Sequence, residues 1–307
     1  MIQATLPRLT SLGQDLDTSP EAFGELESSL DIQDDAAALR ESIAENGYLF
    51  LPGYLDRDEV LAARRATLEK ISEAGLLDPA YDIDEAICAP HRKFSFMPEL
   101  AKDNPALMKV LYSGRMMEFY DLFLGGKARH FDYTWMRAVA PGKGTPPHCD
   151  IVYMGRGTKN LYTSWTPLGD IPIEIGGLIV LEGSNRIERL KANYGSKDVD
   201  SFCSNRRGDD HVEMGGGGNI TSGGWLSKNP PKLRERLGGR WLTANYRAGD
   251  LLIITMYTVH SSIDNGADCI RLSSDTRYQL ASDPVDERWI GEDPIAHGPA
   301  GKRGMIC

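Results

Sequence analysis

Two stretches carry most of the information about this 307-residue chain: GTPPHCDIVYM at residues 144–154 and GDLLIITMYTVHSSIDNGADCIRLS at residues 249–273. The first places His148 and Asp150 two residues apart in a segment that we expect to be extended. Because alternate side chains of a strand emerge on one face, this spacing predicts that an imidazole and a carboxylate converge. The second stretch predicts a buried strand ending near His260 and a polar strand beginning near Arg271.

His260 is the best partner for this pair among the six histidines, because it follows a long apolar run and precedes two small polar residues. Two histidines and one carboxylate on one face of an octahedron are typical of ferrous oxygenases, since three positions stay open for a bidentate oxo-acid and dioxygen. A lone His-x-Asp pair is more often structural than metal-binding. The prediction of a metal site at His148, Asp150 and His260 therefore depends on the distant histidine.

Arg271 follows His260 by 11 residues, which is long enough for one turn and a return along the neighbouring strand. An arginine in a strand is usually a surface or ion-pair residue. Here the guanidinium would enter the same cavity, where its planar set of donors suits a carboxylate bidentately. Ser273, two residues further on the same face, can donate another hydrogen bond. The combination of His-x-Asp, a distant histidine and Arg-x-Ser is more specific than any of its parts.

The rest of the second half consists of short β-rich runs separated by Gly and Pro turns, whereas the first half contains helical patterns. This arrangement predicts a mainly β chain with helices (α+β), with a sandwich, jelly roll or barrel and not a parallel α/β sheet. The expected helices cover residues 35–46, a segment from Asp56 onward and residues 101–124; the expected strands cover 48–52, 130–140, 151–154, 161–168, 177–183, 240–255 and 270–280.

We expect one domain over residues 1–307. It comprises an N-terminal extension (1–34) that wraps loosely over the body, a mainly helical part (35–125), a β core (126–283) and a C-terminal tail (284–307). The core carries an insertion at 184–239 with the run GGGGNITSGG. This run lacks GxxxxGK[ST] and does not join a strand to a helix, so a mobile lid is favoured over a phosphate-binding loop.

Composition excludes several classes of function. A net charge of −10 argues against a nucleic-acid or anionic-membrane partner, because such a surface is repelled by phosphates. No apolar run approaches the length of a membrane-spanning helix, and the N-terminus lacks a signal pattern, so we expect a cytoplasmic protein. Five cysteines without a CxxC pair fit reduced thiols better than a disulfide framework or a zinc site.

The sequence resembles the phytanoyl-CoA dioxygenase family of iron(II)/2-oxoglutarate-dependent oxygenases over most of residues 40–280. The matching pieces are NGYLFLPGYLDRDEV (46–60), PGKGTPPHCD (141–150), WTPLGDIPIEIGGLIVLEGSNR (165–186), AGDLLIITMYTVHSS (248–262) and Arg271. The resemblance implies a double-stranded β-helix (jelly roll, cupin-like) with helices packed outside. It also implies Fe(II) at His148, Asp150 and His260, 2-oxoglutarate against Arg271, and further co-substrate contacts from Trp165 and Ser262.

The expected activity is hydroxylation of a C–H bond in a small organic substrate with O2 and 2-oxoglutarate, releasing succinate and CO2. Alternatives are desaturation, epimerisation or cyclisation by the same iron chemistry in natural-product tailoring, or, in a different class, a non-catalytic metal-binding β-barrel. Arg137 either meets substrate or co-substrate or forms an outward ion pair. Tyr153 and Met154 are candidates for the pocket mouth, and Arg206, Arg207 and His211 are candidates for touching an anionic substrate.

Overall fold

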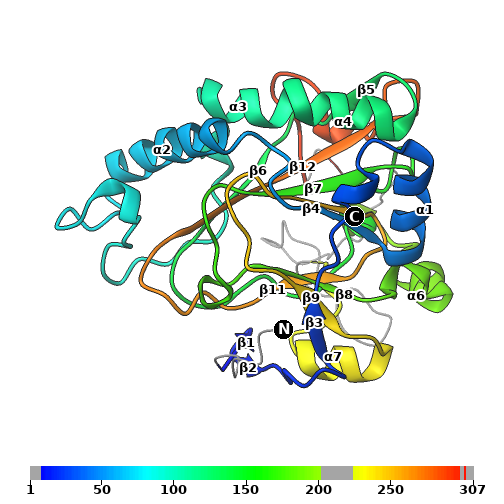
Figure 1. The fold of residues 1–307 in the computed structure, drawn as a ribbon, viewed down its shortest axis with the longest axis horizontal. Helices are drawn as coiled ribbons and strands as arrows, with labels where there is room; N and C mark the ends of the chain where they lie inside the picture. The colour runs from blue at the N-terminus through cyan, green and yellow to red at the C-terminus, as the bar shows by residue number, and fades with distance from the viewer. Residues whose placement is uncertain (1–7, 202–223, 298–300, 302–307) are drawn as a thin grey trace.

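Two facing β-sheets form the core, and helices cover the outer face of the larger one (Figure 1). The computed structural model describes residues 8–201, 224–297 and 301. The larger sheet has the strand order β4-β10-β7-β12-β5, with β6 also paired to β12, and the smaller sheet has the order β11-β8-β9-β3. This arrangement confirms the predicted α+β double-stranded β-helix with helices outside.

The strands are β1 (Thr10–Ser11), β2 (Gln14–Asp15), β3 (Phe23–Glu25), β4 (Tyr48–Leu51), β5 (Ala128–His130), β6 (Trp135–Val139), β7 (Tyr162–Pro167), β8 (Leu178–Leu181), β9 (Trp241–Thr243), β10 (Leu251–Thr255), β11 (His260–Ser262) and β12 (Arg271–Leu280). The α-helices are α1 (Ala36–Asn46), α2 (Arg57–Glu73), α3 (Pro105–Tyr112), α4 (Gly114–Leu124), α5 (Ile151–Met154), α6 (Glu188–Asn193) and α7 (Pro230–Leu237). Short 3-10 turns connect them.

Strand β10 is apolar up to its last residue, Thr255, because both of its faces are buried. Leu251 and Ile253 belong to the core that the larger sheet shares with the helices. Leu252 and Ile254 belong to the core between the two sheets. Side chains on opposite faces of one strand therefore hold the helical layer and the second sheet on either side.

Strand β12 has the same alternation with polar residues on its inner face. Leu272 and Tyr278 join the helix-covered core. Arg271, Asp275 and Arg277, at the alternate positions, line cavities between the sheets. The inner face of β12 therefore carries a row of charged side chains inside a mostly apolar barrel.

The first two helices begin and end where their capping residues predict. Asp35 accepts hydrogen bonds from the first-turn amides of α1, and Gly47 ends this helix with a φ of 79°. Asp56 caps α2 through the amide of Glu59. Most of the segment expected to be helical over 101–124 is so, but as two helices, α3 and α4, because the chain breaks at Ser113.

Other predicted elements differ from the structure. Residues 151–154 form α5 and not a strand, since a four-residue apolar run fits a buried helix turn as well as a strand. The runs 130–140 and 240–255 are each interrupted and contribute β6 and the separate strands β9 and β10. The N-terminal extension is not loose in its described part: β3 pairs in parallel with β9.

The insertion is described only at its two ends. Its first part contains α6, and its second part contains α7. The candidates Arg206, Arg207 and His211 and most of the Gly-rich run lie outside the described residues. None of the helices in the described ranges is long and apolar enough to cross a membrane.

Candidate functional site

Three buried side chains bring their ligand atoms within 4.8 Å of one another: His148, Asp150 and His260. His260 begins β11, and His148 lies beside it, because the backbone N–H and C=O groups of the two histidines exchange hydrogen bonds of 3.0 Å. Asp150 does not continue this extended segment. Its φ of −66° and ψ of −24° are helical, and it is the N-cap residue of α5. The predicted convergence is present, but a turn produces it and not the alternation of a strand.

Each imidazole is held in one orientation by a backbone carbonyl. His148 Nδ1 donates to the Pro146 carbonyl at 2.8 Å, and His260 Nδ1 donates to the Thr258 carbonyl at 3.0 Å. A carbonyl oxygen only accepts, so Nδ1 carries the proton and the Nε2 lone pair is left for a metal. Burial, followed by the neighbouring His260, lowers the pKa of His148 to about 3, which keeps this ring neutral and able to bind a metal.

The two carboxylate oxygens of Asp150 have different neighbours. Oδ1 lies 3.7 Å from His148 Nε2 and 3.8 Å from His260 Nε2. Oδ2 accepts hydrogen bonds from Thr163 Oγ1 at 2.5 Å and from Arg277 Nη2 at 3.0 Å. Burial alone would raise the pKa of Asp150, but Arg277 and then the histidines outweigh it and hold the pKa below its usual range. The carboxylate is therefore ionised, and Oδ1 is the oxygen that faces the two imidazoles.

Arg271 lies at the inner end of the site. It is 3% exposed, and its Nε and Nη1 atoms have no hydrogen-bond partner among the described residues. Burial, followed by the charge of Arg137, lowers the pKa of Arg271 to about 10, so the guanidinium is still cationic at neutral pH. A buried cation with unpaired donors is costly unless an anion completes it, and a carboxylate has the matching geometry.

The other predicted co-substrate contacts lie around Arg271. Trp165 and Ser262 line the same narrow cavity of 20 Å³, together with His148 and His260. Ser262 Oγ also accepts a hydrogen bond from the Thr145 amide at 2.7 Å. Ser273 is fully buried on the inner face of β12, and its hydroxyl has no hydrogen-bond partner in the described ranges.

Arg137 occupies the boundary between this inner cavity and a larger one of 310 Å³, because it lines both. Its Nε donates to Asp275 Oδ2 at 2.9 Å. Of the two alternatives for Arg137, the inward one agrees with the structure, and its ion pair with Asp275 is also internal.

The larger cavity has aromatic walls and the metal-site residues at its base. Its aromatic lining consists of Phe96, Trp135, Tyr153 and Trp225. Both His148 and Asp150 line it. Tyr153 and Met154 thus lie where the sequence placed them, at a pocket in front of the cluster.

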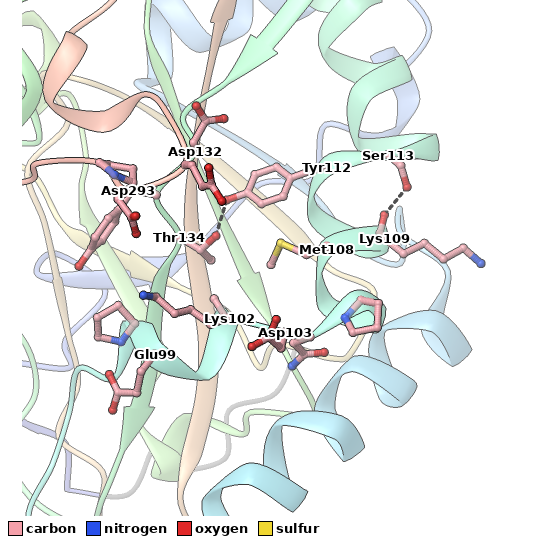
Figure 2. A pocket seen from close by; sticks show the side chains of 17 residues that line it. Glu99, Lys102, Asp103, Met108, Lys109, Tyr112, Ser113, Asp132, Thr134 and Asp293 are labelled. Atoms are coloured by element: carbon pink, nitrogen blue, oxygen red, sulfur yellow. Dashed lines mark hydrogen bonds between the residues drawn. The ribbon is translucent and has the colours of Figure 1, made fainter.

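A still larger groove of 1120 Å³ lies elsewhere, between α3 with the segment before it, the loop before β6 and the C-terminal segment (Figure 2). Tyr112 and Thr134 lie in it and share a hydrogen bond of 2.5 Å. None of the three clustered residues lines this groove. Size alone therefore does not identify the reactive site here, whereas the ligand set does.

Sequence reasoning missed several residues of the site. Asp275 and Arg277 follow Arg271 at even spacing on β12, so the alternation that suggested Ser273 would also have found them. Arg277 pairs with Asp150, and its Cζ lies 4.0 Å from the centre of the Trp135 ring. Thr163 lies two residues before Trp165 on β7, so the same alternation would have found it. Trp225 and His297 have no local signal that marks them.

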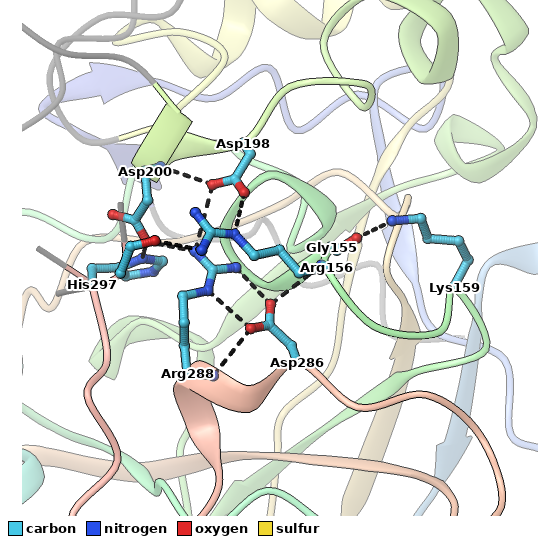
Figure 3. A network of polar contacts seen from close by, with 9 residues as sticks. Gly155, Arg156, Lys159, Asp198, Asp200, Asp286, Arg288 and His297 are labelled. Atoms are coloured by element: carbon cyan, nitrogen blue, oxygen red, sulfur yellow. Dashed lines mark hydrogen bonds and ion pairs between the residues drawn. The ribbon is translucent and has the colours of Figure 1, made fainter. Parts of the chain in front are cut away.

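His297 reaches the larger cavity from the C-terminal tail and belongs to a polar network (Figure 3). Its Nδ1 lies 2.9 Å from Asp200 Oδ2, and Arg288 pairs with both Asp200 and Asp286. Arg156, just after α5, pairs with Asp198. Burial would raise the pKa of Asp200, but His297 and Arg288 hold it at about 2. The network joins the start of the insertion, the end of α5 and the tail beside the cavity.

Comparison with known proteins agrees with this geometry. The family model for phytanoyl-CoA dioxygenase (PhyH) matches residues 43–273. A 1-deoxypentalenic acid 11-beta-hydroxylase of Streptomyces exfoliatus is 28% identical over 260 residues, which cover 81% of this chain and 83% of that protein. Among solved structures, the non-heme alpha ketoglutarate dependent carbocyclase SnoK has a TM-score of 0.56 at 18% identity, covering 85% of this chain and 89% of SnoK.

The epimerase SnoN, solved in complex with Fe3+, alpha ketoglutarate and nogalamycin RO, has a TM-score of 0.52 at 20% identity and covers 86% of this chain and 95% of its own. These two structures show that the fold is shared. The family model spans well over half of the chain and includes all three clustered residues and Arg271. The chain belongs to the phytanoyl-CoA dioxygenase family.

Proposed function

We propose that this iron(II)/2-oxoglutarate-dependent dioxygenase hydroxylates a C–H bond of a small organic substrate. In this proposal His148 Nε2, Asp150 Oδ1 and His260 Nε2 hold the iron, and Arg271 holds the distal carboxylate of 2-oxoglutarate. Trp165, Ser262 and Ser273 complete the surroundings of the co-substrate, and Arg137, at the boundary of the two cavities, meets substrate or co-substrate.

One observation carries the assignment of the metal ligands. Every other polar atom of the three side chains already has a hydrogen-bond partner: the two Nδ1 atoms donate to carbonyls, and Asp150 Oδ2 accepts from Thr163 and Arg277. The atoms that face one another are the three that suit a ferrous ion. A structural cluster would have no need to orient its free atoms inward.

When bound, iron and 2-oxoglutarate supply the oxidation: one atom of O2 enters succinate as CO2 leaves, and the other enters the substrate as a hydroxyl group. The chain itself supplies binding and orientation. Arg277 and Thr163 keep Asp150 ionised and fix its Oδ1, and the carbonyls of Pro146 and Thr258 fix the two imidazoles. The aromatic walls of the larger cavity exclude water from the substrate.

A second outcome of the same chemistry is desaturation, epimerisation or cyclisation. The fold likeness to a carbocyclase and an epimerase supports keeping this alternative. The hydroxylase named among the sequence relatives favours hydroxylation. The cytoplasmic location stays a prediction.

The described ends of the insertion support its proposed role as a lid. Trp225 lines the larger cavity, and the Leu226 amide donates to the Pro147 carbonyl at 2.7 Å, next to the metal site. A lid that excludes water protects the oxidation from unproductive turnover. Shortening the Gly-rich run should therefore impair coupling more than iron binding.

The proposed function is tested by screening metabolite pools for compounds that stimulate succinate release above the uncoupled background. The account predicts a stimulating compound whose product is heavier by one oxygen atom. Mass spectrometry that shows loss of two hydrogens, or an isomer, would instead support the alternative outcome.

A further inference from the structure

The charges around the two cavities do not balance once the site is loaded. Three guanidiniums, those of Arg137, Arg271 and Arg277, face two carboxylates, those of Asp150 and Asp275. Ferrous iron adds two positive charges, and 2-oxoglutarate adds two negative charges. The described aspartates and arginines that line the cavities are thus left with one positive charge in excess. An uncompensated charge inside a protein is costly, so the remaining ligand should be an anion.

The three arginines differ in what already holds them. Arg277 donates to Asp150 and stacks on Trp135. Arg271 is restricted to the inner cavity, where the co-substrate's carboxylate is expected. Arg137 alone among the three lines both cavities. Arg277 also lines the larger cavity and has unpaired Nε and Nη1 atoms, but its side chain lies against the Trp135 ring and is only 3% exposed. Arg137, at 21% exposed, is therefore the better placed of the two to meet a charged group that enters from the larger cavity.

Arg137 has donors to spare. Its Nε takes part in the ion pair with Asp275, and its Nη1 and Nη2 donate to no described residue. The side chain is 21% exposed, so it is open to the cavity and not sealed in the protein. Two parallel N–H donors of a guanidinium suit a carboxylate bidentately.

The apolar surroundings fit the rest of such a substrate. Phe96 lies at the larger cavity with its ring centre 5.1 Å from Arg137 Cζ, and it is 42% exposed, which is unusual for a large apolar side chain. Trp135, Tyr153 and Trp225 complete the aromatic lining. A volume of 310 Å³ is at the lower end of cavities that hold small organic ligands.

We infer that the substrate is an apolar organic monocarboxylate whose charged group binds Nη1 and Nη2 of Arg137 while its hydrocarbon part lies against the aromatic walls in front of the metal site. This inference rests on the proposed function, because the charge balance includes iron and 2-oxoglutarate. The alternative ligand of Arg137 is the second carboxylate of 2-oxoglutarate, which would make the same bidentate contact.

Binding measured without turnover tests the inference. The protein is kept anaerobic with Fe(II) and 2-oxoglutarate and is titrated with a panel of mono- and bicyclic carboxylic acids, including 1-deoxypentalenic acid, each paired with its methyl ester. Tryptophan fluorescence reports binding, since Trp135 and Trp225 line the cavity. We expect the best acid to bind at least about tenfold more tightly than its ester.

Variants of Arg137 and Asp275 test whether Arg137 binds the carboxylate of the substrate. Arg137→Gln should remove the preference for the acid and leave ester binding and the dissociation constant of 2-oxoglutarate within about threefold. Asp275→Asn should bind the acid at least as tightly as the unaltered protein, because it frees Arg137. Arg137→Gln leaves Asp275 unpaired, so the double variant Arg137→Gln/Asp275→Asn is measured beside it. The double variant should also lack the preference for the acid over its ester. Arg186→Gln, at an exposed ion pair with Glu45, is the matched control.

Two results would overturn the inference. One is that no acid of the panel binds more tightly than its ester, including the case in which nothing binds. The other is that Arg137→Gln weakens 2-oxoglutarate and leaves the acid unaffected, which would assign Arg137 to the co-substrate. The visible band of iron with 2-oxoglutarate separates these results from failure of the proposed function, because the band would be missing from the unaltered protein only in the latter case.

Discussion

The inner cavity at Arg271 takes its lining from five strands, β6, β7, β8, β11 and β12, whereas the larger cavity in front of the metal site is lined mostly by segments between strands. Of these strands, β7, β8 and β12 are paired on both sides, and β6 and β11 are each paired on one side. The segments at the mouth, with Tyr153, Trp225 and His297, are fixed by side-chain contacts such as the network around Arg288. The difference suggests that iron and co-substrate chemistry belongs to the rigid end and substrate choice to the other.

Alanine substitution of His260 at the metal site, compared with the same substitution of His297 at the mouth, gives the strongest contrast. His260→Ala removes a proposed ligand, so it should lower iron affinity and turnover by more than about 100-fold while the protein stays folded. Bound iron is measured by metal analysis, and folding by circular dichroism. Full activity of this variant would remove the triad from the account.

Arg271→Lys tests the proposed contact between Arg271 and the co-substrate at the inner end of the site. The charge is kept, but the two parallel donors are lost, so the KM for 2-oxoglutarate should rise at least about tenfold, or about 1.4 kcal/mol. Iron affinity should not change. An unchanged KM would move the co-substrate's carboxylate to another cation, and Arg137 would be the next candidate.

Thr163→Val should have a smaller effect, because it removes one of the two donors to Asp150 Oδ2 and leaves Arg277 in place. We expect iron to bind about tenfold more weakly, with turnover restored at saturating iron. Thr166→Val is the matched control, since the Thr166 hydroxyl is buried and has no hydrogen-bond partner among the described residues. Equal effects of the two changes would show that the bond to Asp150 does not tune the metal site.

The smallest effect is expected at the mouth. His297→Ala should leave the affinities for iron and 2-oxoglutarate unchanged and should raise the KM for the substrate, or the fraction of uncoupled succinate, by about threefold. Both quantities come from parallel assays of succinate and product. A loss of iron from this variant would break the distinction between the two ends of the site.

The sequence predicted the inner end well because short-range rules determine it. The period of two on β12 and the caps of α1 and α2 gave correct elements. The single strand expected to end near His260 was wrong, because β10 ends at Thr255 and His260 begins β11 in the other sheet, where it is not paired with β12. The same period of two places Asp275 and Arg277 beside Arg271. Extending it along the whole strand would have found both.

The mouth could not be predicted in this way. The strand expected at 151–154 is α5, because tertiary packing against the apolar core decides between helix and strand in so short a run. Trp225 and His297 come from the insertion and the tail, where no periodic pattern relates them to the metal site. Their positions depend on long-range contacts such as that between His297 and Asp200.

Anaerobic addition of Fe(II) and 2-oxoglutarate, followed by visible absorption spectroscopy, shows whether His148, Asp150 and His260 hold iron together with the oxo-acid. We expect the weak charge-transfer band of iron chelated by the oxo-acid in the unaltered protein and its loss in Asp150→Ala, since Oδ1 of Asp150 faces both imidazoles. The absence of the band from the unaltered protein, or an unchanged band in Asp150→Ala, would contradict this assignment.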